Sequence, residues 1–569
     1  TPELTSELEK TYVAPRTPQE EQLAKIWAEV LGLKQVGIDD NFFGLGGDSI
    51  LSIQVISKAN QAGLQLTSKH LFEHQTIAQL AAIAETTDSI KTETGLVTGE
   101  VPLTPIQHWF FAQNLPDPQH WNQSVLLEVR QNLDFQRLEQ VIKRSLQHHD
   151  ALRLRFQPTE NGWQQINAAP DEIVPITRLD LSGQLAAEQE EAIASTASEL
   201  QASLNLSAGP LMRIAYFDLG KDKLARLLII IHHLVVDGVS WRILLEDLQT
   251  AYQQLSQGEE IQLPAKTTAF KQWAEKLSEY AYFLGLQSEL KYWHNQTQKQ
   301  IIHLPTDFPD RQDANTVASA GTVSVSLSSE ETQALLQEVP KAYQTQVNDV
   351  LLTALVQACA QWTGDNSLLL TLEGHGREDI FPEVNLSRTV GWFTAQFPVL
   401  LRLGDALSPG DALKTIKEQL RNIPQNGINY GILKYLNQNS SLQVTPQPQL
   451  KFNYLGQFDQ VLPDSSIFQL ASQTTSPNRS LQGSRSHLLE IDGMVTGGQL
   501  RLDWTYSQNI HHPTTIERLA ESFIEALRLL TAHCQSKEAG GYTPSDFPEA
   551  ELSQTELDKL LAKISQKSR

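Results

Sequence analysis

The sequence has few cysteines and no long apolar run, and both shortages narrow the class of protein. Two cysteines in 569 residues, Cys359 and Cys534, cannot build a disulfide framework. No apolar signal segment stands at the start of the chain. The longest apolar run, residues 227–236, is interrupted by His232 and His233 and is shorter than the roughly 20 residues that span a bilayer. We therefore expect a cytoplasmic protein in a reducing compartment, with no segment crossing a membrane.

Positive charge is also scarce. The chain has 44 Lys and Arg against 66 Asp and Glu, which gives a formal net charge of -22 and a pI near 5.1. Such a surface repels phosphate groups and cannot release counterions from them. Nucleic acids and anionic membranes are therefore not expected as partners.

The first 88 residues show three helical patterns. Thr-Pro-Gln-Glu at residues 17–20 is a capping box with proline at the first helical position, so a helix is predicted to begin there. A second helix is predicted to begin at Ser49 and to stop near Gly63, and a third to cover residues 77–84. The second helix has one apolar face, formed by Ile50, Ile53 and Ile56. Residues 12–88 are therefore expected to form a small all-α domain, a four-helix bundle.

Composition divides the rest of the chain. Residues 89–100 belong to a stretch rich in Thr, Ser, Lys, Glu and Gly that is typical of a linker. Residues 101–535 alternate apolar strand-like runs with longer helical patterns, which predicts a large α/β domain. Its size predicts two lobes, at about residues 101–300 and 315–535. Residues 536–569 are expected to be a connector, because a polar segment there precedes a short helical pattern.

Ser49 follows two glycines and opens a helix, so its hydroxyl is expected beside the positive helix end, where a phosphodiester could sit. On the string Gly-Gly-Asp-Ser alone, an ordinary helix cap is the simpler interpretation, because Asp and Ser are preferred cap residues. A hydrolase nucleophile fits less well, because the nucleophile elbow needs a glycine two residues later and Leu51 stands there.

The wider string around this serine favours another interpretation. Asp-Asn-Phe-Phe-Gly-Leu-Gly-Gly-Asp-Ser-Ile at residues 40–50 closely resembles the attachment site of the peptidyl carrier domains of nonribosomal peptide synthetases. The resemblance implies that Ser49 receives 4'-phosphopantetheine from a phosphopantetheinyl transferase and then holds an amino acid or peptide as a thioester. Asp48 before the serine resembles the variant of this site that precedes an epimerization domain.

A second group of polar residues follows the strand predicted at residues 227–231. Because successive strand residues face opposite sides, only one of His232 and His233 can face a given cleft, and the other packs behind it. We assign the structural position to His232. Two adjacent histidines cannot readily ligate one ion, and no His-x-x-x-His or Cys-x-x-Cys pattern lies nearby, so no metal site is predicted.

The string His-His-Leu-Val-Val-Asp-Gly-Val-Ser-Trp at residues 232–241 resembles the core motif of the condensation-domain superfamily. The fold of that superfamily is a pair of chloramphenicol-acetyltransferase-like lobes, and the resemblance implies that His233 is the catalytic base. Asp237 is interpreted as a structural residue that orients the turn at Gly238 through an arginine. Trp241 is interpreted as a core residue.

Two members of the superfamily fit this motif. Condensation domains join two carrier-bound acyl groups, and epimerization domains invert the α-carbon of one. Residues 372–378 (Leu-Glu-Gly-His-Gly-Arg-Glu), 388–394 (Arg-Thr-Val-Gly-Trp-Phe-Thr) and 452–456 (Phe-Asn-Tyr-Leu-Gly) resemble epimerization-specific motifs, and residues 105–110 resemble the opening motif of the family. The sequence thus favours epimerization, with condensation as the enzymatic alternative and an inactive docking platform as the non-enzymatic one.

The chemistry of inversion explains why two of these residues should meet. A proton must leave one face of the α-carbon and another must return to the opposite face, so acid/base groups on both sides are expected. His233 and Glu373 are the predicted pair, one from each lobe, with the pantetheine arm between them. On the residues alone, Glu373 could instead form a structural ion pair with Arg377 or Arg388.

The enolate formed by proton removal needs hydrogen-bond donors. Asn453 and Tyr454 are the candidates to hold its oxygen, and Tyr454 could instead relay the proton. The sequence therefore predicts an isomerase with no dissociable cofactor, which converts an L-aminoacyl or peptidyl thioester on its own arm into an L/D mixture. An upstream adenylation domain and a downstream condensation domain are the expected partners.

Overall fold

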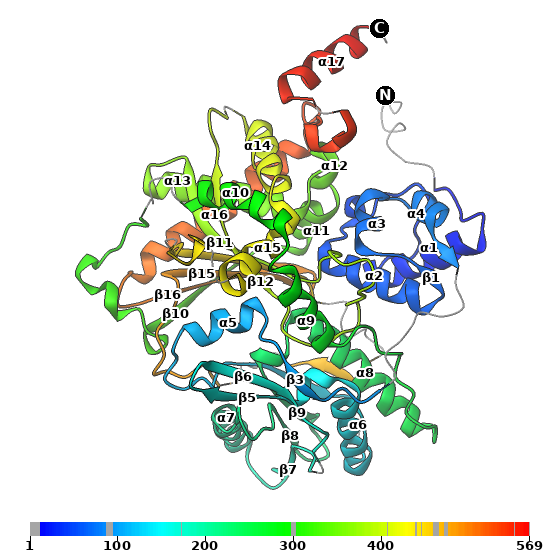
Figure 1. The fold of residues 1–569 in the computed structure, drawn as a ribbon, viewed down its shortest axis with the longest axis vertical. Helices are drawn as coiled ribbons and strands as arrows, with labels where there is room; N and C mark the ends of the chain where they lie inside the picture. The colour runs from blue at the N-terminus through cyan, green and yellow to red at the C-terminus, as the bar shows by residue number, and fades with distance from the viewer. Residues whose placement is uncertain are drawn as a thin grey trace.

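The structure is a computed structural model, and it describes residues 12–86, 95–131, 133–171, 173–297, 303–406, 408–437, 441–444, 447–458, 466–471, 476–550 and 552–567. A small helical domain comes first, and a large α/β domain with sheets of six, five and three strands follows it (Figure 1). This order confirms the predicted fold class.

Four helices form the small domain, namely α1 (Pro18–Leu31), α2 (Ser49–Gln61), α3 (Ser68–Glu73) and α4 (Ile77–Ile83). Thr17 and Glu20 form the predicted capping box at α1, and the Asp48 side chain caps α2 by accepting from two backbone N–H groups. Periodicity missed α3, because six residues are too few to show a helical stripe. Two-residue strands β1 (Leu64–Gln65) and β2 (Glu85–Thr86) pair beside the helices.

The predicted apolar face of α2 is divided between two hydrophobic cores. Leu51, Val55 and Ile56 pack in the core of the small domain. Ile53, which is 3% exposed, belongs to the core of the large domain, and Ile50 packs against that core. The residues of the predicted face therefore have two roles, because Ile50 and Ile53 dock the small domain onto the large one and Ile56 packs within the small domain.

The first lobe of the large domain is built on a five-stranded sheet. Its strand order is β14 (Phe468–Leu470), β4 (Asn122–Val129), β9 (Ala225–His232), β8 (Met212–Asp218) and β7 (Ile176–Asp180). A three-stranded sheet of β3 (Gly99–Val101), β6 (Gly162–Asn167) and β5 (Leu154–Thr159) lies in the same lobe (Figure 1). The predicted linker therefore overlaps β3 at residues 99–100, and its residues 89–94 lie outside the described chain.

The second lobe is built on the six-stranded sheet. Its order is β10 (Ala320–Ser326), β16 (Gln499–Ser507), β15 (Leu489–Thr496), β13 (Leu450–Gln457), β11 (Ser367–Gly374) and β12 (Ala395–Arg402). β11, β13 and β15 run parallel in the middle of this sheet, so their carboxyl ends meet at one edge. Glu373, Asn453 and Tyr454 all lie near that edge.

Helices pack on these sheets and between the lobes. In the first lobe they are α6 (Phe135–His148), α7 (Ala186–Ala202) and α8 (Gly238–Ser256), whereas α5 (Pro105–Ala112) and α9 (Phe270–Tyr280) contact elements of both lobes and α10 (Leu290–Thr297) packs on β12 of the second. In the second they are α11 (Ser329–Gln337), α12 (Val339–Tyr343), α13 (Val347–Thr363), α14 (Pro409–Arg421), α15 (Ile428–Gly431) and α16 (Pro513–Cys534). No helix in the described chain is both long enough and apolar enough to cross a bilayer.

One strand departs from the predicted division into lobes at about residues 101–300 and 315–535. β14 belongs by sequence to the second lobe, yet it pairs antiparallel with β4 at the edge of the sheet of the first lobe. The backbone N–H of Asn122 also donates to the carbonyl of Asn478. The chain between β13 and β15 therefore crosses to the first lobe and returns.

The C-terminal residues are packed on the second lobe before α17 (Gln554–Lys567) begins. Asp546 accepts a hydrogen bond of 2.6 Å from the Lys417 ammonium, which is 1% exposed and also donates to the carbonyl of Tyr343. The segment predicted as a connector is thus anchored at its start by a buried ion pair.

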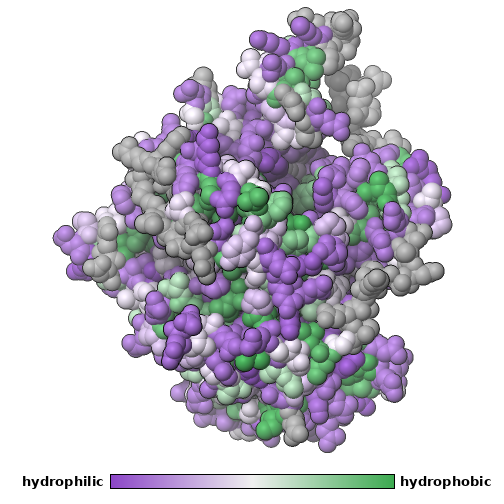
Figure 2. Space-filling view, in the orientation of Figure 1, coloured by the Kyte–Doolittle hydropathy of each residue, from purple (hydrophilic) through white to green (hydrophobic). Residues whose placement is uncertain are grey.

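Figure 2 shows that most of the viewed face is hydrophilic, with small separated apolar patches.

Replacing Asp546 with alanine is expected to lower the free energy of unfolding of the large domain by about 3 kcal/mol, because the buried Lys417 ammonium loses its counter-ion. Urea unfolding followed by tryptophan fluorescence measures the change. The control is Asp558→Ala on the exposed face of α17, which should change stability little. Equal stability of the two variants would contradict the anchor.

Candidate active site

His233 lies where β9 ends and a short 3-10 turn leads into α8. Its Nδ1 is 2.8 Å from the carbonyl oxygen of Val236, so Nδ1 holds the proton and donates it. The ring of Trp392 stacks on the imidazole with centroids 4.2 Å apart. Nε2 therefore presents a lone pair, which is the form that a general base requires.

A glutamine that sequence analysis missed contacts this nitrogen. Nε2 of Gln123, on β4, lies 3.2 Å from Nε2 of His233. Trp241 donates from its indole N–H to Oε1 of Gln123 at 2.8 Å, which turns the amide N–H₂ toward the imidazole. Trp241 is 3% exposed, so it packs in the core and also orients this amide. Gln123 stands 110 residues before His233, and no local pattern links the two.

His232 is fully buried behind the site. Its Nε2 lies 2.8 Å from the carbonyl oxygen of Pro118, and its Nδ1 accepts from the N–H of Leu234. Burial lowers the pKa of His232 to about 3, so the ring is neutral. Both ring nitrogens of His232 are thus engaged in hydrogen bonds within the protein.

Asp237 joins the two lobes. Arg377, which follows β11, donates to its two carboxylate oxygens at 2.7 and 3.0 Å, and the N–H of Phe393 donates to one of them. Asp237 also caps α8, which begins at Gly238, by accepting from the N–H of Ser240. Arg377 is thus the arginine that the sequence could not identify.

Glu373 lies at the carboxyl end of β11, with its side chain 14% exposed. Gln396 on the neighbouring strand donates to Oε1 at 2.8 Å, and Nζ of Lys451 is 3.5 Å from the same oxygen. The alternative of an ion pair with Arg377 or Arg388 is wrong. Arg377 binds Asp237, and the guanidinium of Arg388 binds two other carboxylates, those of Glu246 and Asp247.

The surroundings of His233 and Glu373 lower the pKa of both groups, which leaves the imidazole neutral and the carboxylate charged. Burial lowers the pKa of His233, although the carboxylate of Glu373 acts in the other direction. Burial would raise the pKa of Glu373, but the charge of Lys451, the hydrogen bond from Gln396 and the charge of His233 together lower it. At neutral pH the site therefore holds a neutral imidazole and a carboxylate that influence each other across the two lobes.

β13 places the two predicted donors on different faces of the sheet. Residues alternate along a strand, so Asn453 lies on the face of Lys451 and Glu373, and Tyr454 on the opposite face. Burial, followed by the charge of Asp48 in the small domain, raises the pKa of Tyr454 well above its ordinary value. The structure therefore brings Asn453, rather than Tyr454, to the face of the acid/base pair.

The small domain docks with Ser49 next to the end of β13. Nε2 of Gln457 donates to the carbonyl of Gly46 at 2.7 Å, and Lys58 on α2 pairs with Glu246 on α8 at 3.5 Å. The small domain lies against the large one beside α11 and α9 in Figure 1. Ser49 is the first residue of α2 and is partly exposed, so its hydroxyl stands at a helix N-terminus that favours an anion.

Three buried polar atoms beside Ser49 test whether a phosphopantetheine arm fits here. Oη of Tyr454, Nε of Arg242 and Oδ2 of Asp48 have no hydrogen-bond partner among the described residues. Each of these residues influences the pKa of another, so they lie together where the two domains meet. An arm with a phosphate, a hydroxyl and amide groups supplies partners of the kind that such atoms need, and the residues present fit it.

A recess lies beside the proposed acid/base pair. Trp392, which stacks on His233, and Gln396, which binds Glu373, both line it. The remaining lining is mostly aromatic and aliphatic, and includes Trp109, Trp273, Leu277, Phe393, Phe397 and Tyr430. The site therefore has an apolar recess next to its polar groups.

Away from His233 and Glu373, one cluster of side chains has the composition of a metal site. His148, His149 and Asp247 bring possible ligand atoms together, and it is the one such group within the described ranges. Asp247 already accepts from His149 at 2.9 Å and forms an ion pair with Arg388. We assign no metal to it.

Gly456 allows the close approach of the small domain. It has a φ of +73°, and an added Cβ would lie 2.8 Å from Oδ2 of Asp48. Gly456→Ala is expected to separate the two domains, measured as a longer distance between spin labels placed on each. Gly258→Ala is the matched control, because its φ is +81° and nothing lies within 4 Å of the added Cβ. An unchanged distance in Gly456→Ala would contradict this docking.

Family models match nearly the whole chain. One described as a condensation domain covers residues 97–553, and one described as a phosphopantetheine attachment site covers residues 21–84. The second match indicates a covalently attached 4'-phosphopantetheine.

Curated relatives agree with these matches. One of the linear gramicidin synthase proteins of Brevibacillus parabrevis is 51% identical over 566 residues, which are 98% of this chain and 7% of that protein. A chondramide synthase of Chondromyces crocatus is 48% identical over 97% of this chain and 14% of its own length. The chain thus spans only a small part of these relatives.

Solved structures agree as well. The epimerization domain from the third module of tyrocidine synthetase B is 40% identical, with a TM-score of 0.74 over 78% of this chain and 100% of that one. The condensation domain of a monacolin K polyketide synthase shares the fold at 16% identity, with a TM-score of 0.61 over 77% of this chain and 98% of that one. The chain therefore belongs to the condensation-domain family of nonribosomal peptide synthetases, with a phosphopantetheine attachment domain in front of the condensation-type domain.

Proposed function

We propose that this chain epimerizes the α-carbon of an aminoacyl or peptidyl thioester held on the phosphopantetheine arm of its own Ser49, giving an L/D mixture. The observation that carries the proposal is that a neutral imidazole, His233, and a carboxylate, Glu373, come from different lobes and lie close enough for each to influence the pKa of the other. The 40% identity with a solved epimerization domain supports it.

His233 serves one face of the α-carbon. Its Nδ1–H bond to Val236 fixes the tautomer, so Nε2 is the atom that accepts a proton. The amide of Gln123 holds that lone pair in place before the reaction. Trp392 covers the ring and excludes water from one side of it.

Glu373 serves the other face. Gln396 and Lys451 both contact its Oε1, so the second oxygen, Oε2, is left for the substrate. The arm, when bound, supplies a thioester, whose carbonyl makes the α-proton more acidic. Asn453 on the same face is the candidate donor for the negative charge that develops on the thioester oxygen, and such a donor contributes about 3 kcal/mol.

Condensation is the alternative, because the family model that matches residues 97–553 is described by that activity. It would use His233 to assist amide formation with an acceptor on a second carrier, and it gives Glu373 no role. In either case we propose that an adenylation domain, a downstream condensation domain and a phosphopantetheinyl transferase act with this chain.

The proposal is tested by loading Ser49 with an L-phenylalanyl-pantetheine arm, quenching, releasing the amino acid and measuring its chirality. D-Phenylalanine is expected from the wild type, and His233→Ala and Glu373→Gln should each slow its appearance by at least about 100-fold, because proton transfer is lost on one face. Ser49→Ala is the loading control. Only L-product from the loaded wild type would overturn the proposal, and an amide formed with a second aminoacyl carrier would favour condensation.

The hydrogen bond from Trp241 to Gln123 gives a separate expectation. Trp241→Phe frees the Gln123 amide to rotate, so His233 loses its oriented partner, and we expect epimerization to slow by about tenfold at unchanged loading. Trp504→Phe is the matched control, because Trp504 is also fully buried and its indole N–H has no partner among the described residues. Equal rates in the two variants would count against a role for Gln123.

A further inference from the structure

Two bases without an acid cannot invert a carbon atom. One group must remove a proton while another already holds the proton that returns to the opposite face. Burial keeps His233 neutral, and Lys451 with Gln396 keeps Glu373 ionised, so neither holds a spare proton at rest. If the chain acts as proposed above, one of the pair must be supplied with a proton from elsewhere.

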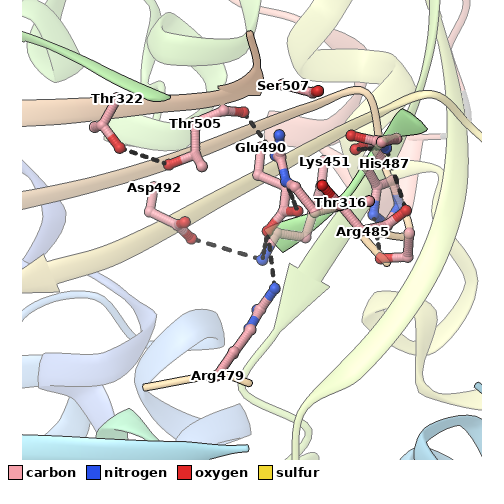
Figure 3. A network of polar contacts seen from close by, with 12 residues as sticks. Thr316, Thr322, Lys451, Arg479, Arg485, His487, Glu490, Asp492, Thr505 and Ser507 are labelled. Atoms are coloured by element: carbon pink, nitrogen blue, oxygen red, sulfur yellow. Dashed lines mark hydrogen bonds and ion pairs between the residues drawn. The ribbon is translucent and has the colours of Figure 1, made fainter. Parts of the chain in front are cut away.

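A cluster of charged side chains around Lys451 lies next to Glu373, and Figure 3 shows Lys451 with Arg479, Arg485, Glu490 and Asp492. Its centre is the Lys451 ammonium, which lies 3.5 Å from Glu373, 3.9 Å from Glu490 and 3.8 Å from Asp492. The strands β11, β13 and β15 bring these four side chains to one face of the sheet. Lys451 therefore touches Glu373 on one side and two further carboxylates on the other.

The remaining charges of the cluster distinguish those two carboxylates. Arg485 lies 3.1 Å from Glu490 and Arg479 lies 3.5 Å from it. Burial would raise the pKa of Glu490, but Arg479, Lys451 and Arg485 outweigh it and hold the pKa far below its ordinary value. Glu490 thus stays ionised and takes no part in proton exchange.

Asp492 has a different environment. Its side chain is 37% exposed, against 10% for Lys451 and 14% for Glu373, so it is the end of the cluster that meets water. Partial loss of solvation, together with the charges of Glu373 and Glu490, raises the pKa of Asp492, although Lys451 opposes the shift. Asp492 is therefore the carboxylate of the cluster best suited to pick up a proton from solvent.

The other titratable groups near Glu373 do not offer such a route. His487 is hydrogen-bonded to Thr371, and burial lowers its pKa to about 4, so it is neutral. Arg377 is held by Asp237. His233 faces Glu373 from the other lobe and is the second member of the acid/base pair.

We propose that Asp492 and Lys451 form a proton path that loads and unloads Glu373 from solvent. Asp492 first accepts a proton from a hydronium ion of the solvent, and Lys451 then donates one N–H proton to the Glu373 carboxylate while it takes the Asp492 proton as a replacement. Lys451 remains an ammonium throughout, and the net change is one proton moved from water to Glu373. The two transfers occur together, because the carboxylates of Glu373 and Glu490 favour the charged form of Lys451 against the effect of burial.

Lys451 and Asp492 are positioning residues in this scheme, because they act through Glu373. The variant that tests the path is Asp492→Asn, which keeps the shape of the side chain and removes its ability to take up a proton. Asp503→Asn is the matched control. Asp503 lies directly opposite Asp492 in the β15–β16 ladder and is 35% exposed, but its ion-pair partner is Arg501.

Three measurements are made on the full chain. With the L-phenylalanyl arm on Ser49, Asp492→Asn is expected to slow the appearance of D-product by at least about tenfold, and added acetate should restore part of the rate. In the unloaded protein, the infrared titration of Glu373, identified by its loss in Glu373→Gln, should move to lower pH in Asp492→Asn, because Lys451 then serves one carboxylate fewer. Asp503→Asn should match the wild type in all three.

The outcomes separate this inference from the function on which it rests. No D-product from the loaded wild type overturns the proposed epimerization itself. An active wild type with Asp492→Asn equal to Asp503→Asn overturns the proton path alone. A slow Asp492→Asn that acetate does not restore, with a lower melting temperature, assigns a structural role to Asp492 and also overturns the path.

Discussion

The cleft depends on the buried ion pair between Asp237 and Arg377. Each residue of the proposed acid/base pair stands four positions before one member of it, His233 before Asp237 and Glu373 before Arg377. The pair is bidentate and nearly inaccessible to water, so it fixes both distance and orientation between the lobes. Removing one partner of such a pair costs about 3–5 kcal/mol, because the other charge stays buried. The relative position of His233 and Glu373 is therefore set by a contact that has no part in the proposed chemistry.

The two lobes place His233 and Glu373 in different electrostatic environments. His233 lies under an aromatic ring and beside an amide, where the neutral form of imidazole is favoured. Glu373 lies beside a cluster in which Lys451, Arg479 and Arg485 balance three carboxylates when all are ionised. Two titratable groups with separately controlled environments are the usual basis for assigning acid and base roles. Here the protonation of the two groups is controlled by residues on neighbouring strands, and the substrate does not need to contact these residues.

Local signals in the sequence predicted the elements that local physics determines. The capping box at Thr17 and the cap at Asp48 begin their helices as expected, and the apolar run before His232 forms a strand. Such local signals could not predict which residues contact His233 and Glu373. Gln123 lies 110 residues from His233, and Lys451 lies 78 residues from Glu373, because strand pairing brings them together only after folding. The alternative ion pair of Glu373 with Arg377 does not form for the same reason, since Arg377 binds Asp237 from the other lobe.

Strand β14 limits how the lobes can move. Two lobes joined only by a hinge can rotate apart freely. Here a segment that belongs by sequence to the second lobe is part of the sheet of the first, through the pairing of Phe468–Leu470 with β4 and the hydrogen bond from the Asn122 N–H to the Asn478 carbonyl. Separating Phe468–Leu470 from β4 would leave backbone N–H and C=O groups of both strands without their partners. The sheet that carries His233 is therefore complete only when the chain has been synthesised past residue 470.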